Sequence, residues 1–147
     1  MTEAKRVDFY ILEAAEPAGR MQFACRLTEK AYGLNTQVYA HAESAADAQR
    51  FDEMLWTFRQ GSFIPHQLLT DNPEQRAPVS IGSGENRAAQ GDLLINLTDE
   101  LPQFSAGFAR VAEIICANES ARLAGRERFK QYRDMGLEPA THEIGRA

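Results

Sequence analysis

The sequence has few cysteines and no long apolar segment, and both shortages exclude classes of protein. Its two cysteines, Cys25 and Cys116, lie far apart without metal-ligand spacing, which is typical of a protein from a reducing compartment. The segment 1–12, MTEAKRVDFYIL, contains only a short apolar run, so neither a signal peptide nor a membrane span is predicted. We therefore expect a cytoplasmic protein with no membrane partner.

Histidine is also scarce, and the three histidines form no metal or catalytic motif. His41, His66 and His142 include no i, i+4 pair and no accompanying carboxylate cluster, so no metal site is predicted. Cys25 is expected on the core face of a helix, where a thiol behaves as a small apolar group. A Cys–His pair assembled by the fold stays an alternative, but no catalytic constellation stands out.

Positive charge is deficient in the whole chain but concentrated near its end. The 16 Lys and Arg against 21 Asp and Glu give a net charge of -5 and a pI of about 5.2. Phosphate binding needs a basic surface, so duplex DNA is disfavoured as the main ligand. Yet Ser120–Arg133 holds five basic residues and one acidic residue, a local net of +4, which leaves -9 for the remainder. A surface polarised in this way suggests a partner.

The order of predicted elements indicates an α/β domain. The length of 147 residues, with 44% hydrophobic and 25% charged residues, is typical of one soluble domain. Strands alternating with amphipathic helices imply a three-layer, Rossmann-like domain whose mostly parallel sheet is covered on both faces. We predict a single domain over 1–147, in which 137–147 is a C-terminal tail. Strands are predicted at 7–12, 36–41, 78–82, 92–97 and 111–116, and helices at 17–33, at 44–58 with Ser44 as N-cap, and from Asn118 to about Met135 with Gly136 after it. The segment 59–78 is predicted as loop, and 101–110 is ambiguous, with one or two helical turns.

A glycine-containing segment, IGSGENRAAQG, is the one hint of a nucleotide site. Gly82 and Gly84 follow a predicted strand, but Arg87 stands where the G-x-G-x-x-G fingerprint needs its third glycine. No helix with an apolar face follows, and the G-x-x-x-x-G-K-[ST] pattern is absent. A polar surface turn explains the segment better, and no cofactor is predicted.

The last predicted helix has a basic face that includes one aromatic ring. At 100° per residue, Arg122, Arg126, Phe129, Lys130 and Arg133 fall within one 100° sector. Such a face is often simply solvated. Phe129 favours a binding function instead, because a ring among like charges suits an apolar slot beside carboxylate-binding guanidinium groups.

The opposite side of that helix should pack on the sheet, and it contains one anomaly. Arg128 lies on this apolar side, where it either extends its charged end to solvent or forms a buried pair. The apolar residues on this side are Ala121, Ala124, Tyr132 and Met135.

A second candidate surface is aromatic. Trp56 lies outside the apolar stripe of its predicted helix, and Phe63, Ile64 and Pro65 follow in a loop. Large apolar residues exposed together are typical anchors of a protein interface. Alternatively, the loop folds back and buries them. The pattern does not decide between the two.

Five segments together resemble the bacterial DNA polymerase III chi subunit family. They are VDFYIL, AQRFDEMLWTFRQGSFIPHQL, APVSIG, DLLINL and RERFKQYRDMG, in that order over nearly the whole chain. The resemblance implies a non-enzymatic accessory subunit of the clamp loader with a Rossmann-like fold that binds no nucleotide. It also implies two partners: the acidic C-terminal tail of single-stranded-DNA-binding protein, and the psi subunit, which links chi to the clamp loader.

Site residues follow from the same resemblance. Arg126, Phe129 and Lys130 would belong to the tail pocket, with Arg122 and Arg133 on the same face and Ile115 lining the pocket. Trp56 and Phe63, with Ile64 and Pro65, would form the psi surface. Family members often have Tyr where this chain has Phe129, which removes a hydroxyl but keeps the ring.

Two other hypotheses remain beside this adaptor function. One is a Rossmann-type nucleotide-binding or enzymatic module with a degenerate glycine loop at Gly82 and Gly84. The other is direct binding of single-stranded nucleic acid by the last helix, which needs stacking aromatics along a continuous basic groove. One helix face and a net charge of -5 make the latter a poor fit, and no direct DNA binding is expected.

Overall fold

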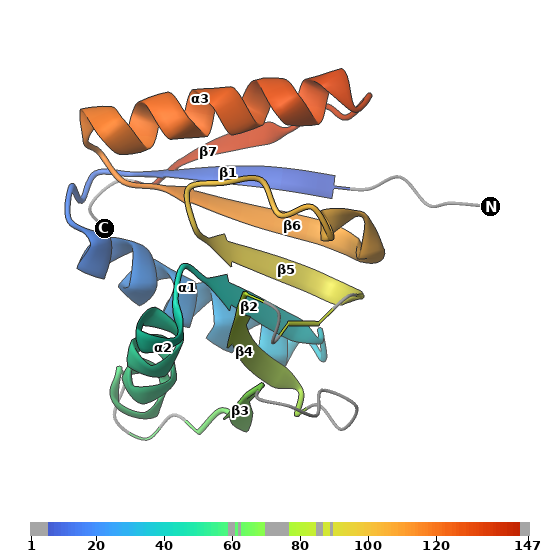
Figure 1. Ribbon diagram of the computed structural model, residues 1–147. Helices are drawn as coiled ribbons and strands as arrows, with labels where there is room; N and C mark the ends of the chain where they lie inside the picture. Colours follow the sequence, from blue (N-terminus) through green and yellow to red (C-terminus); the bar gives the residue numbers. More distant parts are fainter. Residues whose placement is uncertain are drawn as a thin grey trace.

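The described residues form seven strands and three α-helices, with the strands in one sheet (Figure 1). The computed structural model describes residues 6–58, 61, 63–69, 77–84, 87–88 and 90–144. In chain order the elements are β1 (Arg6–Leu12), α1 (Pro17–Gly33), β2 (Val38–Ala42), α2 (Ala45–Thr57), β3 (His66–Leu68), β4 (Val79–Ser83), β5 (Gly91–Leu97), the 3₁₀ helix η1 (Ser105–Gly107), β6 (Phe108–Ile115), α3 (Glu119–Asp134) and β7 (Ala140–Ile144). None of the helices in the described residues is both long and apolar enough to cross a membrane.

All neighbouring strands pair in parallel, in the order β3-β4-β2-β5-β6-β1-β7. This confirms the predicted three-layer α/β fold. Two strands were not predicted from the sequence: β3 lies inside the segment 59–78 that is predicted as loop, and β7 lies inside the segment 137–147 that is predicted as tail. Both are short edge strands without a buried residue, so neither carries the apolar run that marks a central parallel strand. The ambiguous segment 101–110 contains η1 and the start of β6.

The helices begin and end where local chemistry predicts. Ser44 caps α2 by accepting a hydrogen bond from the Asp47 amide at 3.1 Å, and Asn118 caps α3 by accepting one from the Ala121 amide at 2.8 Å. After α3, Gly136 has a φ of 87°, a left-handed conformation that favours glycine and ends the helix.

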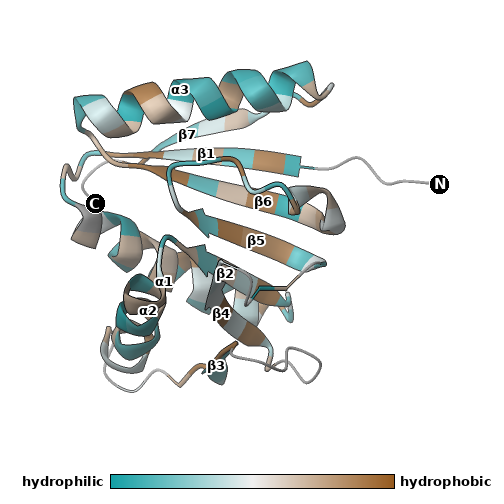
Figure 2. Cartoon of the chain, in the orientation of Figure 1, coloured by the Kyte–Doolittle hydropathy of each residue, from teal (hydrophilic) through white to brown (hydrophobic). Residues whose placement is uncertain are grey.

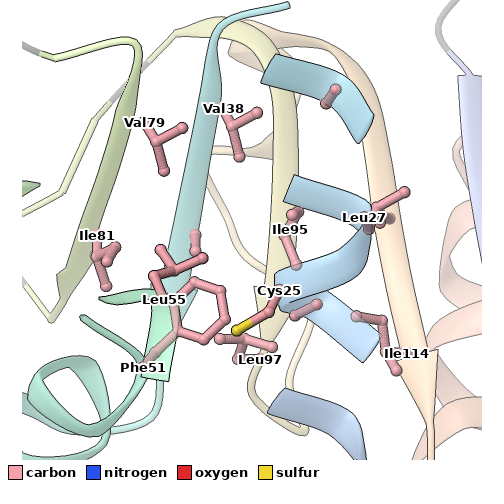
Figure 3. Packing of buried hydrophobic residues seen from close by; sticks show 14 of the residues in the cluster. Cys25, Leu27, Val38, Phe51, Leu55, Val79, Ile81, Ile95, Leu97 and Ile114 are labelled. Atoms are coloured by element: carbon pink, nitrogen blue, oxygen red, sulfur yellow. The ribbon is translucent and has the colours of Figure 1, made fainter. Parts of the chain in front are cut away.

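Apolar side chains fill both faces of the sheet. The α1 and α2 side holds the larger cluster, in which Cys25, Phe51 and Leu55 pack against strand residues such as Ile95 (Figure 3). The α3 side holds a second cluster built from β1, β5, β6 and α3. In Figure 2 the central strands are mostly hydrophobic, whereas α3 is mostly hydrophilic, with short hydrophobic segments. One side of α3 is therefore left to solvent.

A buried polar network fixes α3 on this second face. Glu113 of β6 is fully buried, and Arg128 of α3, at 2% exposure, donates to it over 2.9 Å. Tyr132 donates to the same carboxylate at 2.9 Å, and Asn96 of β5 approaches both of its oxygens at 3.1 and 3.0 Å. Burial raises the pKa of Glu113, although the Arg128 charge and the donors from Asn96 and Tyr132 oppose that rise. Arg128 therefore forms a buried pair, with Glu113, and does not extend its charged end to solvent.

On the predicted sheet-facing side of α3, one apolar residue differs from the prediction. Tyr132 is buried as predicted, whereas Met135, which is predicted to pack on the sheet, is 51% exposed. Met135 is the C-cap residue, so the helix has already ended there and helical periodicity no longer sets its direction.

The edge strand β7 is held by side chains as well as by its parallel pairing with β1. His142 lies 2.9 Å from the buried carboxylate of Asp8, which also accepts from Arg110 at 3.0 Å, and the His142 ring stacks on Tyr10. Burial alone would raise the pKa of Asp8, but the bonds from His142 and Arg110, with the Arg6 charge, lower it. The segment predicted as a tail is therefore part of the sheet up to Ile144.

The buried pair predicts a large loss of stability for Arg128→Ala. Removing the guanidinium leaves the Glu113 carboxylate buried without its cation, which typically costs about 3–5 kcal/mol. Chemical denaturation should show this decrease in the free energy of unfolding. Arg126→Ala, two residues away on the exposed face, is the control and should change it by about 0.5 kcal/mol or less. Equal stability of the two variants would contradict the structural role of Arg128.

Candidate functional site

A small apolar pocket lies between α3 and the strands β1, β6 and β7. Its volume is about 260 Å³. Its apolar lining comes from β1, β6 and α3, and Gly125 of α3 lies directly beside the Ile115 side chain of β6. We call it the α3 pocket. Its lining residues are Phe9, Ile11, Ile115, Arg122, Gly125, Arg126, Phe129 and Thr141. The volume suits one aromatic side chain and is below the range of about 300–1,000 Å³ that is usual for small-molecule sites.

Two arginines on the pocket rim have exposed guanidinium groups. Arg122 and Arg126 are both exposed and one helical turn apart on α3. Lys130 is exposed on the next turn but does not line the pocket, and Arg133 lines an adjoining depression. Among the residues that the structure describes, none of these four cations has an ion-pair partner. Their positive charge is therefore available to an external anion.

Phe129 forms a wall of the α3 pocket. Its ring is half-buried, with its centroid 5.2 Å from that of Phe9, and it also lines the depression beside Arg133. The sequence places Phe129 on the edge of the basic sector, and the structure turns it toward the sheet. The two depressions thus share this ring, and together they follow one side of α3.

Several pocket residues come from strands and were not predicted. Phe9 and Ile11 of β1 and Thr141 of β7 line the pocket, whereas Ile115 of β6 is the one strand residue that was predicted. Phe9 and Ile11 alternate with core residues of the other face, as in any buried strand, so no local signal marks them. Thr141 belongs to the strand that sequence analysis missed.

The aromatic surface on the other side of the molecule is exposed in part. Trp56 is 50% exposed and Phe63 is 67% exposed, and their ring centroids are 5.8 Å apart. We call this pair the Trp56–Phe63 surface. Pro65 beside it is half-buried. Ile64 is 2% exposed and belongs to the core, so its predicted place on the exposed surface is wrong.

His66 connects the segment that holds Phe63 and Ile64 to α2. Its ring nitrogens lie 2.6 Å from the carbonyl oxygen of Ile64 and 3.1 Å from that of Asp52 in α2. The His66 ring also contacts Trp56, with centroids 4.3 Å apart. The loop is thereby fixed to α2 with Ile64 inside and Phe63 outside, which sequence pattern alone could not predict.

The described residues offer little support for a nucleotide, metal or thiol site. In this fold class the first strand-to-helix turn binds phosphate, but here the turn 13–16 is Glu-Ala-Ala-Glu, which contributes two carboxylates and no glycine. Gly84 has a φ of 56° and is followed by β5 instead of a helix; residues 85–86 and 89 lie outside the described part. Within that part no group of three His, Cys, Asp or Glu could hold a metal. Burial raises the pKa of Cys25 to about 12, so its thiol stays protonated.

Comparison of the fold with solved structures shows its class. T4 UvsW matches with a TM-score of 0.66 at 8% identity, and a Dbp5 variant from S. cerevisiae matches with a TM-score of 0.64 at 13% identity. Each match covers 95% of this chain, but this chain spans only 41% of either protein. At such low identity the likeness concerns the fold alone.

Comparison of the sequence shows the family. The family model for the DNA polymerase III chi subunit, HolC, matches residues 4–140. A protein named DNA polymerase III subunit chi from Pseudomonas aeruginosa is 44% identical over 96% of this chain and 98% of its own length. Proteins of the same name from Haemophilus influenzae and Escherichia coli are 32% and 29% identical, over 97% and 90% of this chain and 99% and 94% of their own lengths. The chain therefore belongs to the DNA polymerase III chi subunit family.

Proposed function

We propose that the protein is an adaptor of the replication complex that binds an acidic, aromatic-ended peptide in the α3 pocket. The peptide is the C-terminal tail of single-stranded-DNA-binding protein. A second contact, at the Trp56–Phe63 surface, attaches the protein to the clamp loader through the psi subunit. The observation that carries the proposal is an apolar, ring-sized pocket with two exposed arginines, Arg122 and Arg126, on its rim.

The shape of the α3 pocket explains the need for an aromatic residue. Phe9, Phe129 and the aliphatic floor offer an apolar slot in which a ring loses its contact with water, and burial of apolar area is the main source of affinity. Ring pairs with offset or edge-to-face geometry add to it. A C-terminal residue brings both a ring and an α-carboxylate, so the ring enters the slot while the carboxylate pairs with a rim arginine.

The remaining cations suit the acidic residues that precede the terminal ring. Lys130 lies one turn beyond Arg126, and Arg133 lines the depression that shares Phe129 with the pocket. An extended peptide that leaves the pocket along α3 would pass both side chains. The protein's net charge of -5 disfavours the DNA strand itself, so the adaptor touches the protein that coats the strand.

The Trp56–Phe63 surface has the composition of an interface centre. Two large rings lie side by side and more than half of the Phe63 side chain is in water, which is unfavourable unless a partner covers it. Aromatic side chains of this kind dominate the binding energy of many interfaces. These exposed rings and the acidic first turn suit a binding, non-enzymatic protein, which we propose acts with the replication complex in the cytoplasm.

A peptide titration tests the tail pocket. A short acidic peptide with a C-terminal Phe should bind with roughly micromolar affinity, because it is disordered before binding. Its affinity should decrease as salt increases, since exposed ion pairs are screened over about 10 Å at 0.1 M. Arg126→Ala should weaken binding by an amount on the order of 1–2 kcal/mol.

Isothermal titration calorimetry measures each of these values. Lys30→Ala, which removes an equal charge from the exposed last turn of α1, should leave the affinity unchanged apart from a slight nonspecific effect. Equal weakening by Lys30→Ala and Arg126→Ala would show attraction by net charge without a specific pocket.

If the Trp56–Phe63 surface binds the psi subunit, removing the Phe63 ring should weaken binding without lowering the stability of the protein. Phe63→Ala should weaken binding of the psi subunit by about 2 kcal/mol or more, as expected for an interface anchor, and should leave the melting temperature nearly unchanged. Leu34→Ala, at a residue that is 69% exposed elsewhere, is the matched control and should not affect psi. Ile64→Ala should instead lower stability by about 2–5 kcal/mol. Surface plasmon resonance with psi, together with thermal melts, distinguishes these variants, and full binding by Phe63→Ala would contradict the interface.

A further inference from the structure

Gly125 lies in the interior of α3, where glycine destabilises a helix relative to alanine. Its surroundings show why glycine is needed. A Cβ atom at this position would lie 2.8 Å from Cδ1 of Ile115, 3.3 Å from its Cγ1 and 3.4 Å from its Cγ2. The first distance is shorter than van der Waals contact allows. The glycine therefore lets α3 approach β6 more closely than any other residue would.

Both residues of this close contact also line the α3 pocket. Ile115 extends from the end of β6 under α3, and it is 4% exposed. The terminal methyl group of an isoleucine is its most easily displaced part. A displaced Cδ1 has little room in the packed core but free space in the adjoining pocket. The position of Cδ1 thus fixes the floor of the pocket.

We propose that Gly125 and Ile115 together set the depth of the α3 pocket, and thereby select a single six-membered aromatic ring at the end of the bound peptide. This inference rests on the proposed function of the pocket. Gly125 allows the floor to lie low enough for a ring to enter, and the Cδ1 atom of Ile115 stops a larger ring. Both residues are specificity determinants, and neither carries charge.

The size of the pocket is sufficient for a single aromatic side chain. Its volume of about 260 Å³ leaves room for one ring between Phe9, Phe129 and the Ile115 floor. A floor raised by one methyl group removes contacts along the whole edge of the ring. Overpacking of this kind is costly because the neighbouring side chains must leave their preferred rotamers.

The variant Gly125→Ala tests the inference, and a second substitution, Ile115→Val, should restore the binding that it loses. This variant should bind a peptide ending in Phe at least about tenfold more weakly than wild type. Its melting temperature should change little, since alanine favours the helix while Ile115 is displaced. Ile115→Val removes the Cδ1 atom that a Cβ at position 125 would meet. The double variant Gly125→Ala/Ile115→Val should therefore regain most of the affinity, as measured by calorimetry.

Ile115→Val alone gives a second, independent measurement. It deepens the pocket, so the ratio of affinities for Trp-ended and Phe-ended peptides should increase several-fold relative to wild type. This measurement decides the inference even where Gly125→Ala does not fold. An unchanged ratio would overturn the assignment of the floor.

The outcomes separate this inference from the function on which it rests. Wild-type affinity in Gly125→Ala, or no recovery in the double variant, would overturn the role of Gly125 and leave peptide binding intact. Failure of the wild-type protein to bind the acidic, Phe-ended peptide at all would overturn the proposed function and this inference together.

Discussion

The buried pair between Arg128 of α3 and Glu113 of β6 sets the rotation of the helix on which the candidate peptide site depends. The carboxylate lies buried between the sheet and α3 and is also bonded by Tyr132 and Asn96, so α3 has one favourable orientation. In that orientation Gly125 contacts the sheet, and Arg122 and Arg126 line the pocket beside it while remaining exposed. One buried charge therefore determines where four exposed charges lie. Burying the two charges costs desolvation free energy that offsets much of their attraction. The pair therefore fixes the orientation of α3 more than it adds to the stability of the fold.

Charge is distributed so that this fold favours a peptide over a nucleotide. The first strand-to-helix turn, which holds phosphate in related folds, is acidic here, and the positive charge lies on α3 instead. The α3 pocket combines that charge with an apolar slot. Because the rest of the surface is acidic, a negatively charged ligand is attracted to α3 and repelled elsewhere. Under the proposed function, this contrast would direct an acidic peptide to α3 without a large interface.

Local chemistry predicted the parts of this structure that are determined locally. Caps such as Ser44 and Asn118 and the central apolar strands are recognisable in the sequence, and so is the basic face of α3. The features that are not recognisable in the sequence depend on tertiary packing. The edge strand β7 has no apolar run of its own, and Phe9 and Thr141 meet α3 only after the sheet has formed. Ile64 and Phe63 are apolar neighbours, yet in the folded chain Ile64 is buried and Phe63 is exposed.

The proposed function depends above all on an acidic, aromatic-ended peptide that occupies the α3 pocket. Nuclear magnetic resonance of the isotopically labelled protein during titration with such a peptide tests it most directly. The claim predicts that the largest amide shift changes occur at Gly125, Phe129 and Thr141, with no change at Trp56 or Phe63. Changes confined to the Trp56–Phe63 surface, with the amides of α3 unaffected, would contradict it.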